Sequence, residues 1–301
     1  MENHLDSLIQ PQPRRLGAFE VGPLGFGTWR LVAMSAADAQ EKLEAALSAG
    51  MNLVDTADVY GLDWGGAGFG ASEQLLGDVM RAAPELRSRM VLASKGGIVP
   101  GTPYNSARLK EACEASLQRL GVERIDLYQI HRPDLLTHPA EVARVLEDLR
   151  ADGKIAEVGV SNFSPSQTAA LMAHLPFPLA SQQPEYSALH LEPLFDGVFD
   201  QCMAHGQTPL AWSPLAGGRL TQDSEVPDAL LEVLKRLAAR EEVPVATLAL
   251  AFALAHPARP VALVGSTSVQ RIQAAAKALT VTLDRADTYQ IIQASMGEAL
   301  P

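Results

Sequence analysis

The chain has 301 residues, 47% of them hydrophobic, and carries a formal net charge of -11 at pH 7. An acidic surface repels nucleic-acid phosphates, and no apolar stretch approaches the roughly 18 residues of a membrane span. We therefore expect a cytoplasmic protein that binds neither nucleic acid nor membrane.

Neither a leader, a disulfide nor a metal site is expected. Residues 1–15 are polar and contain prolines, without the apolar run of a signal peptide. Cys113 and Cys202 fall in predicted helices without a CxxC motif, which favours buried thiols in a reducing compartment. The seven histidines form neither HxH nor HExxH, so no bound metal is expected.

Strand-like and helix-like segments alternate from residue 24 onward. Each expected strand is a short, mostly apolar run, followed by a loop and a run with helical spacing. Gly50, Gly121 and Gly153 end three of the helices. The expected strands are 24–27, 52–55, 91–95, 125–131, 157–160, 179–183, 208–212 and 261–265. The expected helices are 36–49, 71–82, 106–120, 139–151, 165–174, 192–205, 228–240, 244–256, 269–279 and 286–298.

This alternation predicts the fold class. Eight strand–helix units without a break in composition indicate a (β/α)8 TIM barrel, one domain over residues 1–301 with its core at about 24–279. Segment 14–22 is expected to form a hairpin at the bottom of the barrel, and 286–298 to be an extra C-terminal helix. A doubly wound sheet is the competing architecture, but no GxGxxG motif follows the first strand.

Four polar residues stand at or just after successive strands: Asp55, Tyr60, Lys95 and His131. Barrel active sites lie at the carboxyl ends of the strands, so we expect the four side chains to meet. A lysine beside a phenol lowers the phenol pKa from about 10, and a carboxylate holds the lysine. The set predicts a proton-donating site and a carbonyl reductase. Taken singly, each residue has an ordinary alternative, such as a turn cap for Asp55.

Six motifs support this function because they occur in one order along the chain: DTADVYG at 55–61, SK at 94–95, IHRP at 130–133, GVSNF at 159–163, QPEYS at 183–187 and AWSPLAGGRL at 211–220. In this order they resemble the aldo-keto reductase family, in particular its bacterial NADPH-dependent oxidoreductases. The resemblance implies reduction of an aldehyde or ketone to an alcohol. It also implies that Tyr60 donates the proton, that Lys95 paired with Asp55 eases its release, and that His131 orients the carbonyl.

The resemblance implies NADPH as the cofactor, with NADH as the alternative. Ser161, Asn162 and Gln183 match residues that hold the nicotinamide carboxamide, and Trp212 offers a face on which the ring stacks. A turn or helix cap is the alternative for Ser161 and Asn162. The expected cofactor contacts are Gly27, Thr28, Trp29, Asp55, Ser161, Asn162, Gln183, Trp212, Ser213, Leu215, Gly217, Arg219, Gly265, Ser266, Thr267, Ser268 and Arg271.

The cofactor phosphate is expected after the eighth strand. There Ser266, Thr267 and Ser268 open a helix, and hydroxyls and N–H groups at a helix start suit a phosphate. Arg271, one turn on, is expected to pair with the 2'-phosphate of NADPH or to stack on adenine. A lysine that relatives often carry near Gly265 is absent here, which weakens the preference for NADPH.

The substrate is expected to contact Trp29, Tyr60, Trp64, Phe69 and His131. Tyr186 is a further candidate for the same mouth. These side chains are mostly aromatic, so they favour a small or medium uncharged aldehyde or ketone. The glycine-rich loop 61–70 is either a substrate lid or a permissive connection.

Two other functions stay open on the sequence. One is a sugar or polyol dehydrogenase that works in the oxidative direction with NAD. The other is a sensor subunit that binds a nicotinamide nucleotide with little turnover. Cofactor preference and steady NADPH oxidation discriminate among the three, while the sequence leaves the oligomeric state open.

Overall fold

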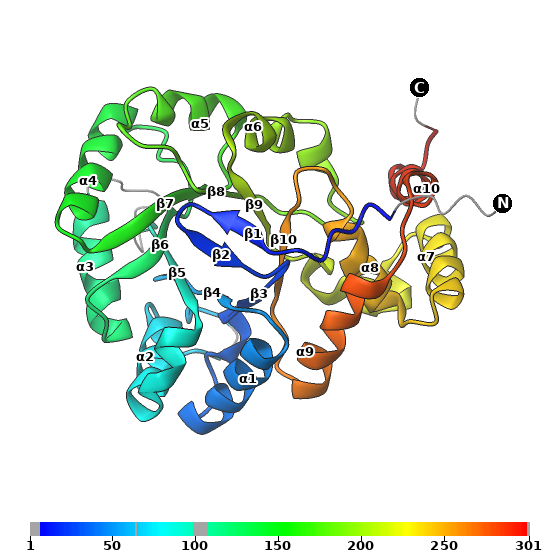
Figure 1. The fold of residues 1–301 in the computed structure, drawn as a ribbon, viewed down its shortest axis with the longest axis horizontal. Coiled ribbons are helices and arrows are strands. Elements are labelled where there is room, and N and C mark those ends of the chain that lie inside the picture. Colours follow the sequence, from blue (N-terminus) through cyan, green and yellow to red (C-terminus); the bar gives the residue numbers. More distant parts are fainter. Residues whose placement is uncertain (1–6, 64, 99–107, 300–301) are drawn as a thin grey trace.

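The computed structural model describes residues 7–63, 65–98 and 108–299. Within these ranges, parallel strands close into an eight-stranded barrel in the order β10-β3-β4-β5-β6-β7-β8-β9, with helices around it (Figure 1). The predicted (β/α)8 class is confirmed. The barrel strands are β3 (Leu24–Gly27), β4 (Leu53–Asp55), β5 (Val91–Gly96), β6 (Ile125–Ile130), β7 (Ile155–Ser161), β8 (Ser181–Gln183), β9 (Thr208–Ala211) and β10 (Val261–Val264).

The helices largely follow the predicted spans. The α-helices are α1 (Ala36–Ser48), α2 (Ala71–Ala82), α3 (Leu109–Leu120), α4 (Pro139–Ala151), α5 (Pro165–Met172), α6 (Val198–His205), α7 (Asp228–Arg240), α8 (Val245–Leu254), α9 (Val269–Ala275) and α10 (Arg285–Met296). The 3-10 helices are η1 (Trp29–Leu31), η2 (Pro84–Arg89), η4 (Glu192–Leu194), η5 (Ala216–Thr221), η6 (Asp223–Glu225) and η7 (Ala276–Thr280).

Two predicted helices are divided in the structure. The span 192–205 becomes η4 and α6, separated at Gly197, whose φ of 86° lies in the left-handed region that an α-helix excludes. The span 269–279 is α9 followed by the tighter turn η7. Of the predicted start of α3, residues 106 and 107 lie outside the described part of the chain.

Alternation of side chains along each strand decides what enters the barrel. Leu53, Ala93 and Leu127 belong to one buried apolar cluster with residues from other barrel strands. Two residues further on, the same face carries Asp55, Lys95 and the unpredicted Gln129. The apolar layer therefore lies below a polar layer, and the polar layer is at the carboxyl ends of the strands.

The segment before the barrel forms the predicted hairpin, β1 (Arg14–Leu16) and β2 (Phe19–Val21), which lies across one end of the barrel in Figure 1. Leu16 is fully buried in the same cluster as the interior barrel residues. Thr208 Oγ1, at the start of β9, donates to Arg15 O at 2.7 Å. The hairpin therefore covers the amino ends of the strands, opposite the polar layer.

The extra C-terminal helix is also confirmed. The helix α10 packs beside α7, where Arg240 donates to both carboxylate oxygens of Asp287 at 2.9 and 2.8 Å.

No helix of the described residues is long and apolar enough to cross a membrane.

Candidate active site

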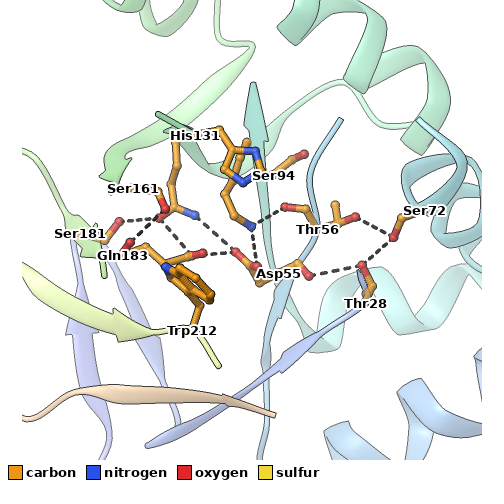
Figure 2. Close-up of polar contacts among 12 residues, drawn as sticks. Thr28, Asp55, Thr56, Ser72, Ser94, His131, Ser161, Ser181, Gln183 and Trp212 are labelled. Carbon is orange, nitrogen blue, oxygen red and sulfur yellow. Dashed lines mark hydrogen bonds and ion pairs between the residues drawn. The ribbon is translucent and has the colours of Figure 1, made fainter. Parts of the chain in front are cut away.

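The structure brings the four predicted catalytic residues together. Lys95 Nζ donates to Asp55 Oδ2 at 2.6 Å and to Thr56 O at 2.9 Å, and both charged side chains are buried. Figure 2 labels Asp55, Thr56 and His131 at this site. The same nitrogen lies 4.8 Å from the centre of the Tyr60 ring. The Tyr60 and His131 rings meet edge to face with their centres 5.8 Å apart. A phenol, an ammonium, a carboxylate and an imidazole therefore form one group.

Asp55 is fixed by amides as well as by the lysine. Its Oδ1 accepts from Gln183 Nε2 at 3.0 Å and from Gln129 Nε2 at 3.3 Å. Gln129 in turn accepts a hydrogen bond from Ser181 Oγ at 3.3 Å. The sequence prediction missed Gln129, although its position two residues before His131 places it on the inward face of β6. The amide therefore completes the set of donors around the Asp55 carboxylate.

Burial and charge act in opposite directions on the two proton-carrying groups. Burial alone lowers the pKa of Lys95, but Asp55 and Tyr60 raise it, so that the pKa lies above its usual value. Burial raises the pKa of Tyr60, and the charge of Lys95 opposes this without outweighing it. The expected lysine effect is thus present, but the expected net lowering of the Tyr60 pKa is wrong, because the hydroxyl loses its hydration.

His131 is held neutral. Burial lowers its pKa well below 6.5, and the charges of Lys95 and Arg132 lower it further. Its Nδ1 is buried and has no hydrogen-bond partner among the described residues. A neutral imidazole here has one N–H that can donate to an oxygen.

The predicted carboxamide residues join into one network beside the four. Asn162, in the left-handed region with φ 59°, donates from Nδ2 to His131 O and to Ser161 Oγ, both at 3.0 Å. Its Oδ1 accepts from Trp212 Nε1 at 3.1 Å. Ser161 Oγ donates to Gln183 O at 2.9 Å. Asn162 therefore links the His131 loop to the half-buried Trp212 ring.

The loop after β9 has an unusual backbone. Ser213 and the run Ala216, Gly217 and Gly218 all have positive φ, at 50°, 51°, 70° and 107°. The Arg30 guanidinium, from η1, donates to Gly217 O. Because β10 lies between β3 and β9 in the barrel, this contact spans the end of β10. The other predicted contacts in this loop are Leu215, which is half-buried, and Arg219, which is exposed.

The end of β10 opens helix α9 as predicted. Ser268 is the helix N-cap, and its Oγ accepts from Arg271 N at 3.4 Å. Ser266 Oγ accepts from Ser268 N at 3.2 Å, while Gly265, Thr267 and Arg271 are exposed. The hydroxyls of Ser266 and Ser268 thus accept hydrogen bonds from backbone N–H groups, and the Arg271 side chain is accessible to solvent.

Bare backbone lies at the ends of β3 and β10. Among the described residues, a Cβ at Gly27 would meet only Val264 O within 4 Å, at 4.0 Å. A Cβ at Gly265 would meet only Gly27 O of these residues, at 3.9 Å. The adjoining Thr28 is buried, and its hydroxyl donates to Asp55 O at 3.3 Å. A cofactor can therefore approach the two glycines closely, whereas the Thr28 side chain is occupied inside the protein.

The predicted substrate residues other than Tyr60 and His131 do not all lie at the site. The Trp29 ring lies 6.1 Å from the Tyr60 ring, centre to centre, and its Nε1 donates to Asp63 Oδ1 at 2.8 Å. The Phe69 ring instead lies 5.8 Å from the Arg119 guanidinium, on the helical layer. Trp64 lies outside the described residues.

Tyr186 does not line the mouth. It is 1% exposed, and its ring packs against Phe199 and Phe252 at centre distances of 4.9 and 5.7 Å. The expectation for this residue was wrong because α6 and α8, which carry Phe199 and Phe252, cover its side chain. The described residues hold no group of three or more metal-ligating side chains of the His, Cys, Asp and Glu types.

Comparison with known proteins agrees with this geometry. The model of the Aldo/keto reductase family matches residues 23–295. The 6-dehydroglucose reductase of Novosphingobium aromaticivorans is 46% identical over 303 residues, covering 98% of this chain and 99% of that protein. The solved glycerol dehydrogenase from Gluconobacter oxydans is 26% identical with a TM-score of 0.83, covering 97% of this chain and 98% of that one.

A third relative carries a cofactor. An aldo-keto reductase from Klebsiella pneumoniae, solved in complex with NADPH, is 27% identical with a TM-score of 0.75, and the match covers 94% of each chain. With the family model matched over most of its residues, the chain belongs to the aldo-keto reductase family of oxidoreductases, as its motifs predict.

Proposed function

We propose that the protein reduces an aldehyde or ketone to the alcohol with NAD(P)H and that Tyr60 is the proton donor. The observation that carries the proposal is the buried ion pair of Lys95 and Asp55, 2.6 Å apart, beside the Tyr60 phenol. General acids of this kind contribute about 10²–10⁴-fold to rate. The same reaction in reverse oxidises an alcohol.

The cofactor supplies a hydride to the carbonyl carbon, and the side chains handle the proton. Tyr60 protonates the substrate oxygen, and the charge of Lys95 stabilises the tyrosinate that remains. Asp55 favours the protonated form of Lys95, as the raised pKa of that amine indicates. The neutral His131 donates a hydrogen bond to the substrate oxygen and so sets its orientation.

The residues at this end of the barrel fit a nicotinamide nucleotide. Trp212 offers a half-buried ring for stacking, beside the Asn162 amide. The glycines at the ends of β3 and β10 leave room for close approach, and Arg271 presents an exposed cation at the start of α9. We propose that Arg271 recognises the 2'-phosphate and that NADPH is preferred over NADH.

For the substrate, we propose a small uncharged polyhydroxy aldehyde. The support is the 46% identity to an enzyme named as a 6-dehydroglucose reductase, whose substrate by name is a sugar carbonyl compound. The likeness to a glycerol dehydrogenase favours polyol oxidation as the second candidate. Both agree with the uncharged substrate expected from a mostly aromatic mouth, of which the Trp29 ring lies beside Tyr60.

We also propose one domain, a cytoplasmic location and no nucleic-acid partner. Support comes from the closed barrel, from the net charge of -11 and from Cys113 and Cys202, which are buried and free.

The test is a screen of carbonyl compounds with NADPH and NADH in parallel, for the parent and for Tyr60→Phe. A hexose carrying an aldehyde at carbon 6, glyceraldehyde and an aromatic aldehyde cover the substrate class, and glycerol with NADP⁺ covers the reverse. We expect NADPH-dependent turnover that falls at least about 10²-fold in Tyr60→Phe with cofactor affinity unchanged. Cofactor binding without turnover in the parent supports a sensor instead, and activity in Tyr60→Phe within a few-fold of the parent removes Tyr60 from its role.

A further inference from the structure

Three buried hydroxyls connect the ends of β3 and β4 to the first turn of α2 (Figure 2). Ser72 Oγ accepts from Thr56 Oγ1 at 3.0 Å and lies 2.8 Å from Thr28 Oγ1, which in turn donates to Asp55 O at 3.3 Å. Because Thr28 gives its proton to Asp55 O, Ser72 is the donor to Thr28. The hydroxyls thus form a chain with one direction, Thr56 to Ser72 to Thr28, in which each bond polarises the next.

The same serine holds the backbone of the proposed proton donor. Ser72 N donates to Tyr60 O at 3.1 Å, and Gly70 N donates to Asp58 O at 2.6 Å. The other end of the chain reaches the lysine, since Thr56 O accepts from Lys95 Nζ at 2.9 Å. The Ser72 amide is therefore bonded to the Tyr60 turn, and its hydroxyl is bonded to Thr56, whose carbonyl oxygen accepts from Lys95.

The residue after Ser72 fixes the position of this turn of α2. The Glu73 carboxylate is fully buried and accepts from Ser94 Oγ in β5 and from Arg119 Nε in α3 at 2.7 Å. Removing Arg119 leaves the buried Glu73 charge unpaired, and removing Ser94 leaves a buried carboxylate oxygen without its donor; both changes are unfavourable. The first turn of α2 is therefore fastened to β5 and α3, and Ser72 has little freedom to shift.

We propose that Ser72 is a positioning residue for the Tyr60–Lys95 pair, holding the phenol-bearing turn and the lysine's backbone acceptor in register through the three-hydroxyl chain. This proposal rests on the function proposed above, in which Tyr60 is the acid. A misplacement of about 1 Å in such a pair can lower the rate about a hundredfold, whereas a single neutral hydrogen bond is worth about tenfold or less.

The first test is Ser72→Ala, which keeps the backbone bond to Tyr60 O and removes the hydroxyl. We expect kcat to fall about five- to tenfold while KM and NADPH affinity stay unchanged. Thr56→Val removes the donor to Ser72 but keeps the carbonyl that accepts from Lys95, and it is expected to act in the same direction. The matched control is Thr288→Val in α10, which loses a hydroxyl bond to Asp284 O of 2.9 Å and should change Tm without changing kcat.

A double-mutant cycle separates positioning from a general loss of stability. Ser72→Ala is measured in the parent and in Lys95→Met. We expect the loss to disappear in Lys95→Met, because the pair that Ser72 positions is already broken. An equal loss in both backgrounds, or no loss in the parent, overturns the proposal. Failure of the proposed function is seen separately, since Lys95→Met alone then keeps activity close to that of the parent.

Discussion

His131 has a charge state that sets its role. Burial, Lys95 and Arg132 all disfavour the imidazolium, so the ring is neutral at physiological pH and can donate a hydrogen bond but has no extra proton to give. Tyr60 differs from His131, because burial raises the pKa of the phenol and the free enzyme keeps it protonated, so that it has a proton to donate. In the proposed function, the two rings, whose centres lie 5.8 Å apart, therefore act differently on one substrate oxygen.

From this we predict a mild effect of His131→Gln. A glutamine amide also donates to a carbonyl oxygen, so kcat should fall less than in Tyr60→Phe. The shape of the pH profile between about pH 5.5 and 7.5 should not change, because burial holds the pKa of His131 well below 6.5 and glutamine has no titrating group. The measurement is kcat against pH for the parent and both variants. An acidic limb near the usual histidine pKa that vanishes in His131→Gln contradicts a neutral His131.

Asp58 is another buried titratable residue, and its carboxylate oxygens accept no well-aligned hydrogen bond from the described residues. Burial raises its pKa well above 3.8; Glu73 raises it further, while Arg119 and Lys95 oppose this. Below the unfolded pKa such a carboxyl group is protonated in both states and does not oppose folding. As the pH rises toward the folded pKa, the unfolded state loses its proton first and becomes more favourable, so stability is lost. Asp58 thus weakens the fold increasingly toward neutral pH.

We therefore predict that Asp58→Asn is more stable than the parent at neutral pH and loses this advantage below about pH 4. The measurement is the free energy of unfolding from urea titrations across that range. Asp148→Asn, at an exposed position in α4, is the control and should show no such trend. A constant difference at all pH values would mean that packing, and not proton uptake, separates Asp58→Asn from the parent.

At the scale of elements, the loops after β3, β9 and β10 are adjacent, because these three strands are neighbours in the barrel. The bond from Arg30 to Gly217 O joins the first two across the third. Three consecutive left-handed residues, 216–218, turn the β9 loop back toward β3. The helix α9 follows β10, which lies between β3 and β9 in the barrel. We therefore propose that the cofactor phosphates bind between these loops.

The prediction at this scale concerns Arg271, in the first turn of α9. A charge-assisted hydrogen bond is worth about 1.5–3 kcal/mol, so Arg271→Ala should weaken NADPH binding by about ten- to a hundredfold and NADH binding much less. Titration of both cofactors by fluorescence quenching measures this. Equal losses would place Arg271 on the adenosine shared by both cofactors, and no loss would return NAD to contention. Arg285→Ala, in the first turn of α10, is a matched control.

At the scale of the whole molecule, stability and chemistry are located at opposite ends of the barrel. The hairpin residues Leu16 and Val21 are buried against the apolar barrel interior, while the polar layer with Asp55 and Lys95 lies at the other end. Burying a side chain such as Leu16 contributes about 1.5–3 kcal/mol. The hairpin therefore stabilises the barrel without touching the site.

Accordingly, Leu16→Ala should lower the free energy of unfolding by about 2–5 kcal/mol and leave kcat and KM unchanged at temperatures where the protein stays folded. Urea unfolding and steady-state kinetics on the same preparation measure both quantities. Leu136→Ala, at a side chain that is 97% exposed, is the control for a leucine that contributes little to the core. A matching loss of kcat in Leu16→Ala would show that the two ends are coupled.

The sequence by itself determined the barrel and the positions of the polar strand ends. Strand–helix alternation, with glycines after the helices, is a local property of the chain, and the carboxyl ends of parallel strands must lie together. Asp55, Lys95 and His131 are therefore neighbours in any closed barrel with these strands. The hairpin was predictable for the same reason, because its two short strands are adjacent in sequence.

Only the tertiary structure decided which distant side chains meet and how far water is excluded. Gln183 reaches Asp55 across 128 positions, and Thr28 reaches Ser72 across 44. The burial of Tyr186, the raised pKa of Tyr60 and the placement of Phe69 against Arg119 likewise depend on the packing of separate helices on the barrel. Solvation is a property of the assembled surroundings, and no local pattern of residues specifies it.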